Sequence, residues 1–305
     1  KLPWRFEWPA GWKALGVDFE PFGKDHAEGS WPSGREIARE VLDIEPPVPM
    51  TYEWFTLNGE ALSSSAGNVV TVAEILDLIE PDVLRYFFAK NPSKQRDLDL
   101  SRIDQLVDDF DRFEAAYFGE VAADERERAF ANRAYPLVVE EVREGRVRLP
   151  FTFAAVLGMT DDRDLRLEMA RREGHIDPET PDEEVDAAMA RVERARNWAK
   201  RMDNEYNYRL QENLPAVDLE PDIEAALDDL AAFITDLNED GIEDGPGEAI
   251  QSEIYETAKR HDVEVGEFFE AGYGLFFGKD QGPRLGPFLA ALDTGFVVDR
   301  LRREA

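Results

Sequence analysis

The chain has 305 residues, 43% apolar and 33% charged, which suffices for a hydrophobic core and predicts two or three domains. It contains no cysteine, which excludes disulfides, thiolate zinc sites and cysteine nucleophiles. A formal net charge of −31, from 66 acidic and 35 basic residues, indicates adaptation to high salt that screens self-repulsion, with an acidic but ordinary protein as the alternative.

Only eight of the 35 basic residues are lysine, which supports the interpretation of salt adaptation. No apolar run approaches the roughly 18 residues of a membrane-spanning helix, and the first residues lack the apolar core of a signal peptide. We therefore expect a soluble cytoplasmic protein. The sequence opens without methionine, inside an aromatic cluster of Trp4, Phe6, Trp8 and Trp12, and we expect it to be a portion of a longer chain.

Residues 1–100 alternate between two kinds of pattern. The segments 17–20 and 52–55 are strand-like, and 33–41, 72–78 and 81–90 are helical. This alternation predicts an α/β domain with a largely parallel sheet. The proline-rich segment 43–49 is predicted to be a connector. The sequence Gly23-Lys24-Asp25-His26 follows the first strand, where open α/β sheets place their ligands.

From Ser101 onward the pattern is almost continuously helical. Ile103, Val107 and Phe110 recur at helical spacing. Thr180 before Pro181 and Glu220 before Pro221 are predicted helix starts. Boundaries are predicted near Leu100 and Gly174, which divides the chain into 1–100, 101–174 and 175–305. Further helices are predicted at 123–142, 151–158, 161–174, 181–202, 222–237, 246–261, 265–277, 283–292 and up to 303.

The loop from Leu62 to Asn68, sequence LSSSAGN, lies between a turn at Asn58-Gly59 and the helix that begins near Val72. Its hydroxyls, amide and backbone N–H groups can donate to phosphate oxygens, and a helix N-terminus adds partial positive charge. A solvated polar cap is the alternative. On spacing alone, the loop indicates a phosphate site only weakly.

Four strings together identify a resemblance. Residues 58–70, NGEALSSSAGNVV, resemble the second signature loop of class I aminoacyl-tRNA synthetases, the Lys-Met-Ser-Lys-Ser type. Pro3-Trp4-Arg5 with PFGKDH at 21–26, EPDVLRY at 80–86 and GKDQGPRLG at 278–286 are similar to the class I lysyl-tRNA synthetases of archaea and spirochaetes. The order of the matches makes the resemblance specific.

The resemblance covers essentially the whole chain, but only the later part of the family. Family members begin with a further half of the nucleotide-binding domain, which carries a His-Ile-Gly-His type motif. His26, His175 and His261 lie in no such motif. The resemblance therefore implies a C-terminal portion of a haloarchaeal-type enzyme. It implies an α/β followed by all-α fold: the later half of a Rossmann-type domain (1–100), a helical stem (101–174) and a helical anticodon-binding domain (175–305).

The resemblance also implies roles for the signature loop. Ser63, Ser64 and Ser65 would be catalytic, and Leu62, Ala66, Gly67 and Asn68 would bind ATP. Family lysines map to Ala61 and Ala66, and the middle lysine of the general signature maps to Ser64. Losing such a phosphate donor commonly costs about 2.7 to 4 kcal/mol in the transition state. Magnesium, the helix N-terminus near Val72 or Lys24 could supply the missing charge.

A lysine-binding pocket is implied at Trp4, His26 and Tyr52, with Asp25 holding His26 or ligating magnesium. An ammonium group can lie over aromatic faces and donate to an imidazole. Without the resemblance, core packing is the more common role for such aromatic residues.

The resemblance implies tRNA binding by the last domain, and we assign Lys279 and Arg284, which flank a Gly-Pro turn, to that contact. Composition alone opposes RNA binding, because a charge of −31 repels a polyanion. Binding would rest on stacking and on arginines such as Arg300, Arg302 and Arg303. The aromatic residues at helical spacing are expected to be core: Phe268, Phe269, Tyr273, Phe276 and Phe277.

The implied activity is ATP-dependent ligation of L-lysine to its tRNA through lysyl-adenylate. Mg²⁺ is expected to accompany ATP, and no zinc site or other metal site is expected in this segment. Neither a membrane nor DNA is expected as a partner. The portion by itself is expected to be inactive. Two alternatives are a non-catalytic tRNA-binding fragment and a class I synthetase for glutamate.

Overall fold

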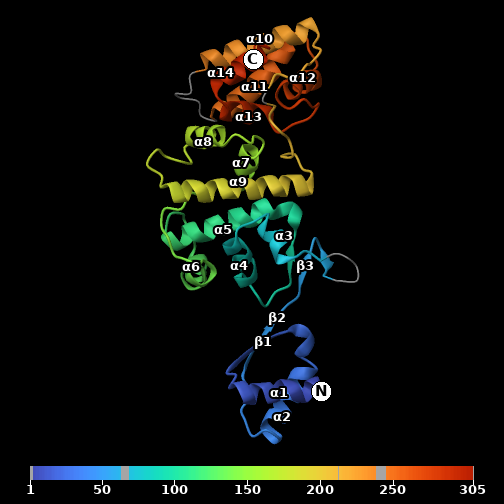
Figure 1. The fold of residues 1–305 in the computed structure, drawn as a ribbon, viewed down its shortest axis with the longest axis vertical. Helices are drawn as coiled ribbons and strands as arrows, with labels where there is room; N and C mark the ends of the chain where they lie inside the picture. Colours follow the sequence, from blue (N-terminus) through green and yellow to red (C-terminus); the bar gives the residue numbers. More distant parts are fainter. Residues whose placement is uncertain (1–2, 63–68, 212, 238–244, 305) are drawn as a thin grey trace.

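A computed structural model describes residues 3–62, 69–211, 213–237 and 245–304. The chain is elongated, and its elements follow one another along the long axis (Figure 1). The strands are β1 (Phe19–Gly23), β2 (Val48–Tyr52), β3 (Phe55–Leu57), β4 (Glu60–Ala61) and β5 (Arg96–Leu98). The α-helices are α1 (Trp4–Leu15), α2 (Ser30–Glu40), α3 (Val72–Leu76), α4 (Pro81–Ala89), α5 (Ile103–Phe118), α6 (Glu125–Val138), α7 (Phe151–Leu157), α8 (Arg163–Arg172), α9 (Asp182–Met202), α10 (Pro221–Asp236), α11 (Pro246–Arg260), α12 (Val265–Phe277), α13 (Leu285–Ala291) and α14 (Thr294–Leu301).

The first unit, α1 to β2, has a small core of its own. Trp12, Phe22, Trp31 and Ala38 are buried together, apart from the larger core of the rest of the chain. Helix α1 was missed from the sequence, because Pro9 lies inside it and proline is typical of helix ends. The three tryptophans of this segment, Trp4, Trp8 and Trp12, are spaced four residues apart on one helix, which turns Trp8 and Trp12 toward the same core.

Two small sheets replace the single sheet that the alternation predicted. Strand β1 pairs with β2 in parallel, and β3 pairs with β5 in parallel and with β4 antiparallel. The prediction that 43–49 is entirely connector was wrong at its end, since Val48 and Pro49 belong to β2. A proline is accommodated there because β2 has only one partner strand among the described residues.

The turn at Asn58-Gly59 is confirmed. Both residues have positive φ, 52° and 79°, which is the backbone of the type I′ turn that connects twisted antiparallel strands and favours Asn-Gly. The side-chain oxygen of Asn58 accepts from the Leu100 amide at 2.8 Å, and the Gly59 amide donates to Asp97 at 2.8 Å. These bonds attach the β3–β4 hairpin to β5 and to the start of the helical part. Residues 63–68, which follow in sequence, lie outside the described residues.

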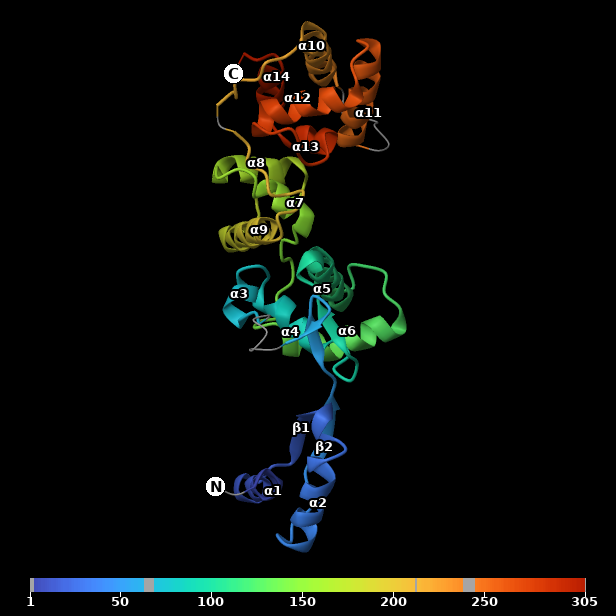
Figure 2. The same ribbon diagram turned by 90° about the vertical axis from the view of Figure 1, so that its right-hand side faces the viewer.

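The predicted helices of the second half are confirmed within a few residues at each end. The start of α9 differs in detail: Pro181 is its N-cap and Thr180 is not, because the Thr180 hydroxyl accepts from the Asp177 amide instead. Helices α7 and α9 pack together, and α9 runs alongside α5 in Figures 1 and 2. The buried Trp198 of α9 donates to the Leu100 carbonyl at 2.8 Å.

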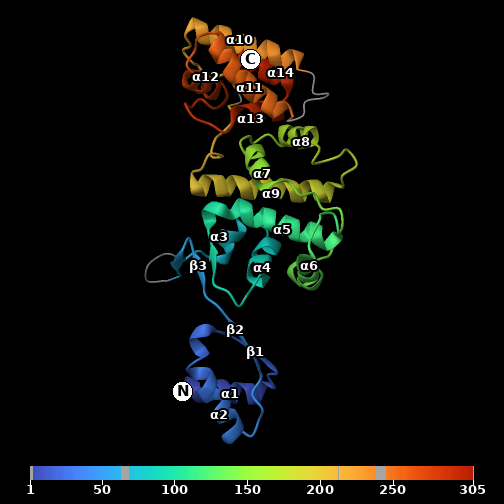
Figure 3. The ribbon, with the colours of Figure 1, turned by 180° about the vertical axis from the view of Figure 1, so that it is seen from behind.

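Helices α10 to α14 form a separate bundle at the far end from α1, as Figure 3 also shows. Phe268, Phe276 and Phe277 are buried in it, which confirms their core assignment. The expectation that Arg300 meets RNA was wrong. Arg300 is fully buried and donates to the carbonyls of Gln211 and Leu275, both at 3.1 Å, so it anchors the connection that enters the bundle.

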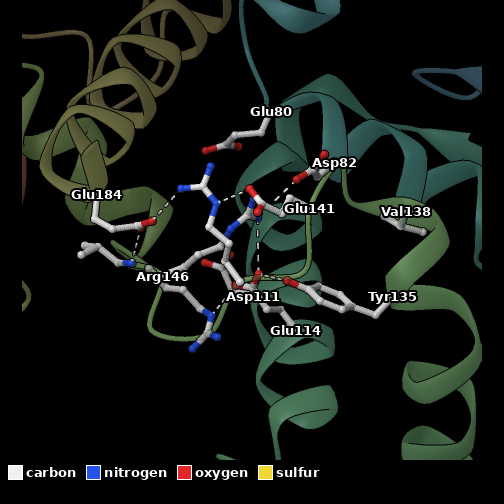
Figure 4. A network of polar contacts seen from close by, with 12 residues as sticks. Glu80, Asp82, Asp111, Glu114, Tyr135, Val138, Glu141, Arg146 and Glu184 are labelled. Atoms are coloured by element: carbon white, nitrogen blue, oxygen red, sulfur yellow. Dashed lines mark hydrogen bonds and ion pairs between the residues drawn. The ribbon is translucent and has the colours of Figure 1, made fainter. Parts of the chain in front are cut away.

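A network of buried charges joins α4, α5, α6 and α9 (Figure 4). Arg191 of α9 donates to Glu80, which precedes α4, at 2.7 Å and to both oxygens of Asp111 of α5 at 2.6 and 2.9 Å. Burial raises the pKa of Glu80, but the Arg191 charge and hydrogen bond outweigh it, and the resulting pKa lies below its ordinary value. Burial raises the pKa of the neighbouring Asp111 carboxyl.

The same network contains a second centre at Glu114, which is almost fully buried. Its carboxylate accepts hydrogen bonds from the Tyr135 hydroxyl and from Arg148, the latter at 2.6 Å. Arg146 lies between Glu114, at 3.4 Å, and Asp82, at 3.2 Å, and so links the two carboxylates. Burial, together with this carboxylate, raises the pKa of Tyr135. Helices distant in sequence are thus held by charge-assisted hydrogen bonds as well as by apolar packing.

Candidate active site

A pocket of about 560 Å³ opens between the first unit and the β3–β4 hairpin. Asp25 and His26 border it from the short 3-10 turn after β1, Tyr52 from the end of β2, and Leu62 from the start of the signature loop. Because β1 and β2 are parallel, their carboxyl ends meet at one edge, which brings these residues together. Four predicted site residues from three separate segments therefore share one pocket.

Trp4 adjoins this pocket through His26. The two ring centroids are 6.0 Å apart with a 39° tilt, and Trp4 is half exposed. Trp8 also contacts His26, with its ring centroid 5.6 Å from that of His26, and it stacks on Trp4 at 5.5 Å. The imidazole nitrogen Nε2 lies 3.4 Å from Asp25 Oδ2. The imidazole thus lies between aromatic rings and a carboxylate.

Gly23 lies where β1 meets the pocket. A Cβ atom at this position would lie 2.6 Å from Asp25 Oδ1 and 3.6 Å from the Tyr52 ring. The backbone itself is ordinary extended chain, φ −67° and ψ 151°. Glycine is therefore needed for the close approach of the Asp25 carboxylate rather than for its dihedral angles.

Lys24 provides a cation at the same edge. Its Nζ lies 2.8 Å from Glu53 Oε1, and the hydrogen bond to Glu53 raises the pKa of the Lys24 ammonium. Glu53, Trp54 and Gln95 also line the pocket. No sequence motif marks these three residues, and the only signal for Glu53 and Trp54 is their position directly after Tyr52.

The start of α3 is a poor substitute for the missing lysines. The helix has one turn, and Thr71 and Glu74 form a capping box in which the Glu74 amide donates to Thr71 and the Glu74 carboxylate accepts from the Thr71 amide at 2.8 Å. That carboxylate places a negative charge at the start of α3, which disfavours a phosphate contact near Val72.

The predicted catalytic and ATP-binding residues Ser63, Ser64, Ser65, Ala66, Gly67 and Asn68 lie outside the described residues. Leu62, the remaining member of that set, is exposed and lines the pocket. Within the described ranges, no three acidic or histidine side chains are grouped to hold a metal ion.

The two predicted tRNA contacts lie in different surroundings. Lys279 follows α12, and its Nζ lies 5.1 Å from the ring centroid of Tyr208. Arg284 forms a bidentate ion pair with Glu248 of α11, and the longer of its two bonds measures 2.7 Å. Lys279 therefore faces a pocket shared with Tyr208, whereas Arg284 is already neutralised.

No helix within the described ranges combines the length and apolarity that crossing a lipid bilayer requires.

Comparison with known proteins identifies the family. Residues 1–140 match the family described as tRNA synthetases class I (K). The chain is 65% identical over 305 residues to the lysine–tRNA ligase of Natronomonas pharaonis and 60% identical over 304 residues to that of Haloarcula marismortui. It is 35% identical over 315 residues to the lysine–tRNA ligase of Pyrococcus horikoshii.

These matches cover 100%, 99% and 100% of this chain but 55%, 54% and 59% of the respective relatives. The chain thus spans slightly more than half the length of the curated relatives it matches. The similarity to haloarchaeal ligases agrees with the interpretation of the acidic composition as salt adaptation. The chain belongs to the class I lysyl-tRNA synthetase family.

Proposed function

We propose that the chain is the part of a lysine–tRNA ligase that carries the lysine pocket, the signature loop and the tRNA-binding helices. The observation that carries the proposal is the convergence of Asp25, His26, Tyr52 and Leu62 on one pocket, with Trp4 against His26. The relatives named above are lysine–tRNA ligases, which supports lysine, ATP and tRNA as substrates.

The pocket suits a substrate that carries an ammonium group. Asp25 and Glu53 supply carboxylates, His26 supplies an imidazole and Tyr52 an aromatic face, which together can accept and partly desolvate the side chain of lysine. The carboxylate of lysine would attack the α-phosphate of ATP, pyrophosphate would leave, and the lysyl group of the adenylate would pass to the terminal adenosine of tRNA. The protein contributes positioning and charge stabilisation.

Lys24 is the proposed replacement for a signature lysine, because it is the cation that borders this pocket beside Leu62. Ser63, Ser64 and Ser65 keep their proposed catalytic role, and Ala66, Gly67 and Asn68 their proposed contact with ATP. Magnesium would enter with ATP, where it would neutralise phosphate charge.

The domain assignment stays a proposal. Residues 1–100 would complete the nucleotide-binding domain, 101–174 the stem and 175–305 the anticodon-binding domain. Since α9 packs on α7 and bonds to Leu100, it supports the stem although it falls in the last range. Lys279 and Arg284 are proposed tRNA contacts, and the cytoplasm is the proposed location.

The first prediction tests this function with a chimera. The 305 residues replace the matching part of the Natronomonas pharaonis ligase, and ATP–pyrophosphate exchange is measured in high salt. We expect exchange that depends on lysine and is absent with glutamate, and none from the 305 residues alone. A second chimera with His26→Ala should lose at least tenfold in kcat/KM for lysine. Exchange supported by glutamate, or an unchanged His26→Ala chimera, would contradict the proposal.

A further inference from the structure

A second pocket, of about 250 Å³, lies between α9 and the end of α12. Its charged lining residues are all cations, in a chain with a net charge of −31. Arg196 and Lys200 come from α9, Arg209 from the connection after it and Lys279 from the turn after α12. The pocket therefore gathers two of the eight lysines of the chain, and its described lining contains no carboxylate.

The walls of this pocket are fixed by bonds to both neighbouring bodies. The Leu210 amide donates to the Met159 carbonyl at 2.8 Å, and the Gln211 amide donates to the Phe276 carbonyl at 2.9 Å. The Arg300 guanidinium donates a hydrogen bond to the Gln211 carbonyl at 3.1 Å. The connection that carries Arg209 is therefore rigidly placed between the stem helices and the last bundle.

The cations of the pocket differ in how far they are already neutralised. Arg196 and Arg209 both donate to Asp161, whose single carboxylate bridges them and leaves one excess positive charge. Lys200 is exposed and has no ion pair among the described residues, and Lys279 contacts only an aromatic face, at 5.1 Å from the Tyr208 ring. The two lysines are thus available to an anion. Burial raises the pKa of Tyr208, and three acidic residues outside the pocket lining, Asp203, Glu205 and Asp280, lie near enough for their negative charges to raise it further.

We propose that this pocket binds a phosphate of an RNA backbone, with Lys200 and Lys279 as its cations and Tyr208 beside it to receive a base or ribose. The inference deepens the proposed function and depends on it for naming tRNA as the RNA. Selection has removed lysine and favoured acids elsewhere, so a lining of four cations and two tyrosines, Tyr206 and Tyr208, indicates a polyanion with planar groups.

The experiment measures binding of a labelled tRNA transcript for lysine to the 305-residue chain by fluorescence anisotropy at several KCl concentrations. The test variant is Lys200→Gln with Lys279→Gln. The control is Lys259→Gln, which removes an exposed lysine of α11 that has no ion pair among the described residues. Urea midpoints of the three proteins verify folding.

We expect the double variant to bind at least tenfold more weakly and its log–log salt slope to flatten by about 0.7 to 0.9, because one phosphate contact is lost. The control should bind like the unchanged chain. An equal loss of affinity in the control and the double variant, or no loss in either, would overturn the proposal. The proposal would also be overturned if the chain without substitutions did not bind the transcript.

A further arm separates RNA from a free anion. Inorganic phosphate should displace the transcript no better than chloride at equal ionic strength, and displacement at low millimolar phosphate would overturn the RNA assignment. Lysine-dependent exchange by the chimera, measured without substitutions in this pocket, tests the ligase activity separately. Lost exchange with retained RNA binding would refute the ligase activity and not this pocket.

Discussion

At the scale of single residues, the candidate active site depends on one close approach. The Asp25 carboxylate fits beside Gly23 only because that residue has no Cβ, and it lies 3.4 Å from His26. The sequence identified His26 and Asp25 through a string of family residues. It could not show that Gly23 limits where the carboxylate lies, because that contact depends on the backbone path of β1 beside β2.

The substitution Gly23→Ala is predicted to weaken lysine binding while leaving the stability of the fold almost unchanged. The new methyl group displaces the end of a movable side chain, so we expect the free energy of unfolding to change by less than about 1 kcal/mol. The displaced carboxylate no longer orients His26, and the KM for lysine of the chimera should rise several-fold in steady-state exchange.

The matched control is Gly11→Ala in α1, where an added methyl group meets open space. It should raise the free energy of unfolding by roughly 0.5 to 1 kcal/mol through helix propensity and leave the KM unchanged. An equal KM in the two variants would show that Asp25 does not position His26.

At the scale of elements, α9 is joined to the region after the signature loop by Arg191. This residue lies between Glu80 and Asp111 and is itself buried. Removing one partner of a buried ion pair leaves the others uncompensated, which costs about 3 to 5 kcal/mol. Arg191→Leu should lower the free energy of unfolding by that amount, as measured by urea denaturation at high salt. Arg201→Leu, on the exposed side of the same helix and 4.0 Å from Glu74, should cost less than about 1 kcal/mol.

The effect of Arg191→Leu is predicted to depend on pH. In the unchanged chain the lowered pKa of Glu80 contributes stability above its unfolded value near 4.5, and this is lost as pH falls through the folded pKa. Without Arg191, burial raises that pKa above the unfolded value, so the variant gains stability as pH falls. The difference between the two proteins should therefore be largest near pH 7 and shrink toward pH 5. A constant difference would show that the carboxylates are not the cause.

At the scale of the whole molecule, the charge of −31 governs stability. Screening shortens the Debye length from roughly 10 Å at 0.1 M to about 3 Å at 1 M salt, so repulsion between surface carboxylates is removed. We predict that the urea midpoint rises between 0.1 M and 2 M KCl. The loss caused by Arg191→Leu should persist at 2 M, because buried pairs are screened much less. A midpoint that falls with KCl would contradict the interpretation of salt adaptation.

The sequence by itself determined the helices other than α1, the Asn58-Gly59 turn, the salt adaptation and the family, because these depend on local periodicity, on turn chemistry, on composition and on ordered strings of residues. It did not determine where strands pair, and β2 begins inside a segment predicted as connector, since pairing depends on a distant partner. Only the tertiary structure buried Arg300 and brought Lys200 and Lys279 into one pocket. Those outcomes depend on contacts between segments far apart in sequence, whose energies no local pattern records.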